Sequence, residues 1–311
     1  MGSDSPNGSW GFPIGTDLPE PVASKPDRPP PIRLADLHPK RFFLDTWRQQ
    51  DEIAWHERAE HSPSFDYRPL VALGLAAVCL TLMEYFGSGY QLGDALRSFD
   101  PSQGKHDSWS WQLRRWRFYN LLEYGYWSGC RVLGYFVLPA LVVRWVFRQR
   151  LRDYGLNLHG LAEHAWLYAL FYLVVLALVV LVSSREDFAS YYPFYKQARR
   201  SWLDLATWEL IYGLQFLALE FFFRGFLLFS CRRALGSHAI FAMTVPYCMI
   251  HFGKPWLEAL AAIVAGIVLG TLALRTRSIS NGFFIHVSVA ISMDAASLLR
   301  GQGLPQQWWP T

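Results

Sequence analysis

The chain has 311 residues, of which 52% are hydrophobic, 16% are aromatic and only 17% are charged. This composition excludes an ordinary soluble domain and predicts a multi-pass membrane protein. The net charge of +4 does not indicate a nucleic-acid surface, because the lysines and arginines mostly flank apolar runs, as is typical of residues that set membrane topology. The four cysteines are scattered without a CxxC pair, so we expect small buried residues.

The N-terminal arm, residues 1–66, is polar and rich in proline, with Pro29-Pro30-Pro31 at its centre. It lacks the apolar core of a signal peptide, and we expect it to be disordered or loosely docked. A helical pattern rich in Trp and charge over residues 42–61 predicts a helix that either lies along the membrane surface or is solvated. His56 and His61 resemble a zinc-protease HExxH with one residue too many, which sets the imidazoles about 140° apart on a helix. We therefore expect no metal site there.

Membrane-spanning helices are predicted wherever an apolar run approaches the ~20 residues that cross the hydrocarbon layer. The runs cover about 69–87, 132–147, 164–182, 205–230, 238–251, 257–274 and 281–299. We therefore predict an all-α polytopic membrane protein with about seven or eight transmembrane helices. Between the first two runs, arginines alternate with aromatic residues over Trp109–Gly129, a mixture that favours an interfacial helix over a further span.

Ionisable side chains inside the later apolar runs mark the candidate site, because such groups are costly in a membrane and are usually functional. Glu220 and Arg224 lie four residues apart, a spacing at which a carboxylate and a guanidinium pair on a helix. Counting about 1.5 Å of rise per residue from one membrane side, Glu220 lies roughly 15 Å deep, His251 roughly 20 Å and His286 roughly 9 Å. Asp294 lies roughly 21 Å deep on the same basis. We therefore expect these residues to reach one central cavity, where a carboxylate and two imidazoles have the chemistry to activate water.

Several short motifs carry these residues in a recognisable order. They are Glu220-Phe-Phe-Phe-Arg224-Gly, an aromatic residue four positions before His251, a Gly-rich span at 265–270, and Arg275-Thr-Arg-Ser-Ile279 before His286. Over about residues 150–299 this order resembles the CPBP family, also called Abi or CAAX-protease-like. The family comprises polytopic membrane proteins, among them the endoproteases that trim prenylated CAAX proteins, and its marks are EExxxR, FxxxH and HxxxN. The resemblance implies a four-helix catalytic core in 150–299, with accessory transmembrane and interfacial helices in 67–149 and a short tail in 300–311.

The resemblance carries over residue by residue. Glu220 and Arg224 match the second Glu and the Arg of the first motif. His251 matches the His of the second motif, in which Tyr247 replaces the usual Phe. His286 matches the His of the third motif.

Two positions depart from the family pattern. The first Glu of the pair, which is usually assigned to water activation, is Leu219, and the Asn of HxxxN is Ala290. Glu220 points about 100° away from position 219 around the helix, so it serves as the base only if the helix is rotated. Asp294, one turn beyond Ala290, replaces the Asn as a hydrogen-bond donor only if its carboxyl is protonated.

The resemblance implies an intramembrane endopeptidase. Glu220 and His251 would activate water, either directly or with a divalent metal such as zinc held by Glu220, His251 and His286. His286 would stabilise the oxyanion. Four further residues are assigned supporting roles: Arg224, Asp294, Tyr247 and Glu209, the last of which lies on nearly the same helix face as Glu220.

The expected partners are the lipid bilayer and a membrane-embedded protein or lipopeptide substrate, with no nucleic acid. We expect a multi-pass protein in the cell membrane of a prokaryote. The sequence leaves the oligomeric state and the substrate open.

Other functions remain open. The loss of the first Glu and of the Asn fits a family member without turnover that acts as a membrane scaffold or partner protein. A small transporter also places ionisable residues at mid-membrane, although no repeat relates the two halves of this chain. A lipid-modifying transferase is a more remote alternative. In a further alternative, the Glu220–Arg224 pair is purely structural. His251 likewise could serve only to hydrogen-bond a helix end.

Overall fold

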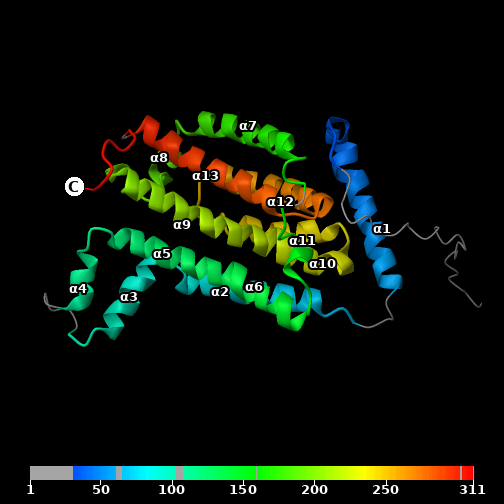
Figure 1. Ribbon diagram of the computed structural model, residues 1–311, viewed down its shortest axis with the longest axis horizontal. Helices are drawn as coiled ribbons and strands as arrows, with labels where there is room; N and C mark the ends of the chain where they lie inside the picture. The colour runs from blue at the N-terminus through cyan, green and yellow to red at the C-terminus, as the bar shows by residue number, and fades with distance from the viewer. Residues whose placement is uncertain (1–30, 61–64, 103–107, 159, 302, 311) are drawn as a thin grey trace, which may run out of the picture.

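The computed structural model describes residues 31–60, 65–102, 108–158, 160–301 and 303–310. Within these ranges every regular element is helical, as the sequence predicts (Figure 1). The α-helices are α1 (Thr46–Ala59), α2 (Arg68–Phe86), α3 (Gly89–Phe99), α4 (Trp109–Arg114), α5 (Tyr119–Val132), α6 (Leu138–Leu141), α7 (Ala165–Val182), α8 (Glu186–Tyr191), α9 (Trp202–Glu220), α10 (Leu228–Leu235), α11 (His238–Met249), α12 (Trp256–Thr276) and α13 (Ser280–Arg300). Among the described residues, four π-helical segments continue neighbouring helices: Lys40–Asp45, Leu133–Val137, Val142–Val146 and Phe221–Leu227.

Within the described part of the chain, six helices are long and apolar enough to cross a membrane, and they confirm six of the seven predicted runs. They are Arg68–Phe86, Tyr119–Val146, Ala165–Val182, Trp202–Leu235, Trp256–Thr276 and Ser280–Arg300. The seventh run forms α11, an apolar helix of only 12 residues. The molecule is therefore an all-α, multi-pass integral membrane protein.

The prediction of an interfacial helix over Trp109–Gly129 is wrong for its second half. Only α4 is a separate short helix, and from Tyr119 the chain stays helical to Val146. The reason is tertiary packing, because the aromatic side chains of this stretch lie against α9 and the loop before it. The Tyr124 hydroxyl donates to the Phe194 carbonyl at 2.8 Å, and Ser128 Oγ donates to the Ile211 carbonyl at 2.9 Å.

The helix that runs through α9, the π-helical segment and α10 forms the centre of the bundle. Figure 1 shows it between α2 and α5 on one side and α7 and α13 on the other. All seven residues of Phe221–Leu227 are buried, and four of them are phenylalanines. Phe222 packs on Tyr135, and Phe223 packs on Tyr247. A π-helical turn widens the helix and often marks a functional position.

The N-terminal helical pattern is confirmed as α1, which packs against the rest of the bundle. Arg58 donates to the carbonyls of Arg233 and Ala234 at the end of α10, at 2.8 and 2.9 Å. The Ser237 amide, just before α11, donates to Asp51 at 2.6 Å. α1 therefore satisfies backbone groups at both ends of the turn between α10 and α11. His61 and most of the predicted polar arm lie outside the described residues.

Candidate active site

Glu220, Arg224 and His286 form a contact network at the centre of the bundle. Arg224 lies in the π-helical segment, and its guanidinium is 3.1 Å from Glu220 Oε1. His286 projects from α13 and places Nδ1 2.6 Å from the same oxygen. Glu220 and Arg224 are both 0% exposed. The predicted pair is therefore present, and an imidazole from another helix joins it.

Tyr247 on α11 links this network to His251. Its hydroxyl lies 2.9 Å from His286 Nε2, and the Arg224 guanidinium lies 3.8 Å above the centre of its ring. Its backbone carbonyl lies 2.8 Å from His251 Nδ1. We call Glu220, Arg224, Tyr247 and His286 the buried network, because all but the edge of the His286 ring are enclosed.

The contact with the Tyr247 carbonyl fixes the tautomer of His251. A carbonyl oxygen only accepts hydrogen bonds, so Nδ1 carries the proton and donates it. Nε2 is therefore the nitrogen with the free lone pair. His251 thus has the form of a proton acceptor in its neutral state.

His251 lies in non-helical backbone far from the membrane side where α11 begins. It follows His238, the first residue of α11, by 13 positions, which corresponds to about 20 Å of depth. Non-helical backbone at such a depth is tolerated where it is buried in protein or lines a water-filled cavity. The turn that carries His251 does line a cavity, to which Ile250, Phe252 and Lys254 also contribute.

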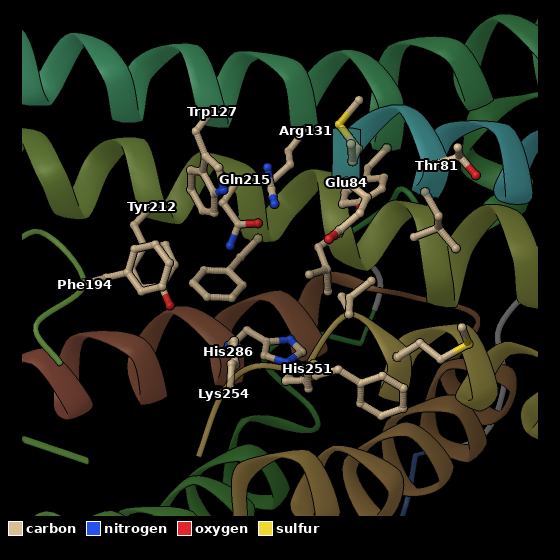
Figure 2. Close-up of a pocket in the computed structure, with 18 of the residues that line it drawn as sticks. Thr81, Glu84, Trp127, Arg131, Phe194, Tyr212, Gln215, His251, Lys254 and His286 are labelled. Carbon is tan, nitrogen blue, oxygen red and sulfur yellow. The ribbon is translucent and has the colours of Figure 1, made fainter. Parts of the chain in front are cut away.

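The cavity has a volume of about 560 Å³ and holds both imidazoles in its wall. Figure 2 shows His251 and His286 on one side, opposite Glu84 of α2 and Arg131 of α5. Aromatic rings from α5, α8, α9 and the loop between α8 and α9 form much of the remaining wall: Trp127, Tyr191, Phe194, Tyr212 and Phe216. A largely apolar wall with a few polar groups is typical of small-molecule and peptide sites.

The prediction that all three site residues open to one cavity does not hold for Glu220. Its neighbour Leu219 lines the cavity, whereas Glu220 is enclosed behind His286. Successive helical residues point about 100° apart, and the carboxylate turns toward α13. It occupies space left by Gly282, where any Cβ would overlap Glu220 Oε2.

Two predicted supporting residues lie away from the cavity. Asp294 is 0% exposed and accepts a hydrogen bond from Trp208 Nε1 at 2.6 Å, so it does not take the place of the missing Asn at the cavity wall. Its neighbour Ala290 packs into the aromatic cluster around Trp208. Glu209 is partly buried on α9 and does not line the cavity.

The donor set does not fit the three-ligand metal site. Glu220 Oε1 is shared by Arg224 and His286, and both nitrogens of His286 already have partners. Within the described ranges, no three or more His, Cys, Asp and Glu side chains are close enough together to hold a metal ion. The described residues therefore do not assemble Glu220, His251 and His286 around a zinc ion.

The sequence analysis missed Glu84 and Arg131 of the cavity wall. One signal was present, because Glu84 is the single acidic residue in the apolar run 69–87, and an ionisable residue in such a run deserves a functional hypothesis. Its position near the end of the run made it resemble a residue at the membrane surface.

Comparisons with known proteins bear on the same part of the chain. Neither the curated proteins nor the solved structures contain a match. Residues 201–292, which carry Glu220, Tyr247, His251 and His286, match the family model described as Type II CAAX prenyl endopeptidase Rce1-like. The resemblance to the CPBP family, to which CAAX-type intramembrane proteases belong, is thereby confirmed over this segment.

Proposed function

We propose that this chain is an intramembrane endopeptidase that hydrolyses a peptide bond of a membrane-embedded protein or lipopeptide. The observation that carries the proposal is His251 in the wall of a membrane-depth cavity, with its tautomer set by the Tyr247 carbonyl. The family match over residues 201–292 supports the same reaction class. The location of the protein in the cell membrane of a prokaryote stays a prediction.

His251 Nε2 is the proposed proton acceptor. It takes a proton from a water molecule as the water oxygen bonds to the carbonyl carbon of the substrate. The same proton then passes from Nε2 to the amide nitrogen as the C–N bond breaks, which yields a carboxylic acid and an amine. Arg131 places positive charge in the cavity wall, which favours the oxyanion formed between these steps, whereas the charge of Lys254 is paired with Glu258 at 2.6 Å.

The buried network is proposed to position His251 and does not contact the substrate in this scheme. Glu220 holds His286, and His286 and Arg224 hold the Tyr247 side chain. Tyr247 in turn presents its carbonyl to His251. Glu220 and His286 therefore keep a place in the site with roles that differ from those expected from the sequence.

A scaffold without turnover is the second candidate, and a specific observation favours it. Leu219, at the position of the family's first Glu, faces the cavity, so an apolar side chain stands where an acid would be exposed. In this case the cavity would bind a membrane-embedded partner and release it unchanged.

Cleavage by purified protein separates the two functions. Wild type reconstituted in liposomes is expected to cleave at least one member of a panel of membrane-embedded peptides and lipopeptides. His251→Ala should reduce the rate by at least about 100-fold, the lower range for general acid–base catalysis. The matched control is His38→Ala, because His38 is exposed in the segment before α1.

Two results would contradict the proposal. Equal cleavage by wild type and His251→Ala would reject the assignment of the proton acceptor, and binding of substrates without any cleavage would favour the scaffold. A chelator-treated sample in the same assay tests for a metal. Activity is expected to survive chelation, because the three proposed ligands do not share one ion.

A further inference from the structure

The cavity contains a carboxylate to which neither the family motifs nor the scheme above assigns a role. Glu84 is the one acidic side chain among the described residues that line it. No described residue forms an ion pair or a hydrogen bond with the Glu84 carboxylate. Its acceptor oxygens are therefore free to bind a group inside the cavity.

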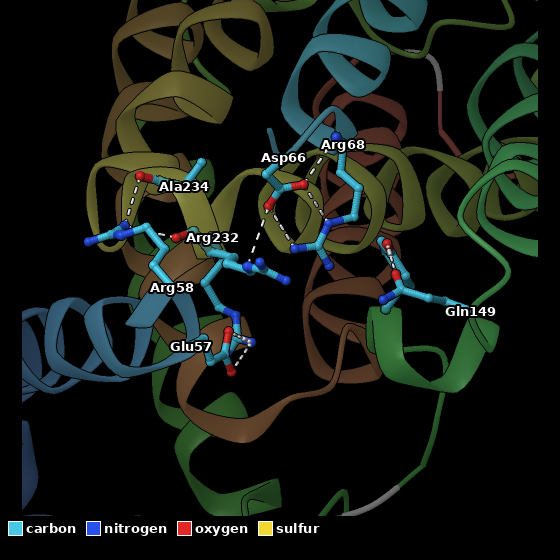
Figure 3. Close-up of polar contacts among 9 residues, drawn as sticks. Glu57, Arg58, Asp66, Arg68, Gln149, Arg232 and Ala234 are labelled. Atoms are coloured by element: carbon cyan, nitrogen blue, oxygen red, sulfur yellow. Dashed lines mark hydrogen bonds and ion pairs between the residues drawn. The ribbon is translucent and has the colours of Figure 1, made fainter. Parts of the chain in front are cut away.

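Glu84 and His251 lie at similar depths in the bundle. α2 begins at Arg68, which pairs with Asp66 at 2.7 Å, and Asp66 is in turn 3.7 Å from Arg233 of α10. Figure 3 shows Asp66 beside Arg68. The contact of Asp66 with Arg233 places the start of α2 at the same level as the end of α10. α11 begins at His238, only five residues beyond Arg233.

The two distances along the helices follow from these starting points. Glu84 lies 16 residues into α2, or about 24 Å, and His251 lies 13 residues beyond the start of α11, or about 20 Å. Figure 2 places the two side chains on opposite sides of the cavity. A water molecule between them would have an imidazole on one flank and a carboxylate on the other.

The end of α2 is held in place from α5. The Tyr126 hydroxyl donates to the Phe86 carbonyl at 2.9 Å, and Arg131 donates to the Gly87 carbonyl at 3.1 Å. The Arg131 guanidinium also stacks on Trp127, 4.3 Å from the ring centre. These contacts satisfy the last carbonyls of α2 and fix the backbone that carries Glu84.

We infer that Glu84 is a catalytic carboxylate of the proposed peptidase, which binds the nucleophilic water together with His251. The water donates one hydrogen to His251 Nε2 and the other to a Glu84 oxygen, so its own lone pair faces the carbonyl carbon. His251 takes the first proton and later gives it to the leaving nitrogen. Glu84 keeps its negative charge throughout and stabilises the imidazolium that forms in between. The second hydrogen stays on the new carboxyl group.

The test compares Glu84→Gln and Glu84→Asp with wild type on a peptide that wild type cleaves. Glu84→Gln is expected to lower kcat at least tenfold with less than a threefold change in KM, because the amide carries no charge to stabilise the imidazolium. Glu84→Asp should recover part of the rate. Glu186→Gln, an exposed acid of α8 outside the cavity wall, is the matched control and should behave like wild type.

The inference rests on the proposed function, and the two fail differently. If wild type cleaves, His251→Ala does not and Glu84→Gln keeps wild-type kcat, then Glu84 is only a solvated acid near a helix end and the inference is overturned. A loss shared equally by Glu84→Gln and Glu84→Asp, with melting temperatures far below wild type, would also overturn it in favour of a structural role. If wild type cleaves nothing, the proposed function itself fails.

Discussion

Removing both partners of the Glu220–Arg224 pair should destabilise the protein by clearly less than the sum of the two single removals. The two side chains are fully buried and 3.1 Å apart, so a single change leaves one charge without compensation. Such a loss typically costs about 3–5 kcal/mol. Arg224→Met also forfeits the contact with the Tyr247 ring at 3.8 Å, a desolvated cation–π interaction of about 2 kcal/mol. The double variant Glu220→Gln with Arg224→Met removes both charges, so it should cost about 2–3 kcal/mol less than the sum of the single changes.

Thermal unfolding in detergent measures these differences. At about 2–4 °C per kcal/mol, each single variant should melt at least about 6 °C below wild type. The matched control is the pair Asp94 and Arg97 on α3, which has a similar distance of 2.8 Å but is exposed to solvent. Asp94→Asn should cost about 1 kcal/mol at most. Additive losses in the double variant, or single losses as small as in the control, would refute the idea that the buried pair is tightly coupled.

Two further predictions concern packing and acid stability. Gly282→Ala should lower the free energy of unfolding by about 1–3 kcal/mol, because its Cβ would overlap Glu220 Oε2. In the control Gly125→Ala the Cβ meets no atom within 4 Å, so this change should be neutral or stabilising. Equal melting temperatures of the two variants would contradict this prediction. Hydrogen bonds from Arg68 hold the pKa of Asp66 below its ordinary value of 3.8. The stabilisation is therefore present above that value and is lost as the pH falls through the lower pKa of the folded state. Melting temperatures measured from pH 6 to pH 2 should fall less in Asp66→Asn than in wild type. An equal fall in the two proteins would contradict the proposed contribution of the Asp66 carboxylate.

The sequence predicts the spans and the central pair well because both depend on local information. An apolar run of sufficient length is enough to identify a membrane helix, and six of the seven predicted runs are such helices. Likewise, the spacing of Glu220 and Arg224 brings the two groups together on one helix whatever surrounds them. The family motifs also identify His251 as a cavity residue.

The directions in which side chains face could not be read from the sequence. Depth counting places Glu220 near the right level, but the rotation of α9 turns the carboxylate to α13 and Leu219 to the cavity. The indole of Trp208 donates to Asp294 Oδ2, a pairing across 86 residues that no local pattern indicates. Glu84 joins the cavity because α5 holds the end of α2 beside it, which is again a tertiary effect.

The shortness of α11 has a consequence for the lipid around it. Its 12 residues cover about 18 Å, whereas an average hydrocarbon layer is about 30 Å thick. Hydrophobic mismatch of this size makes the adjacent bilayer thin or draws headgroups and their hydration inward. A transmembrane helix of another protein that lies beside α11 would therefore leave the hydrocarbon layer part-way along its length. Beyond that point water can hydrogen-bond its backbone carbonyl and amide groups, so this part of the helix unwinds more readily than a part surrounded by hydrocarbon.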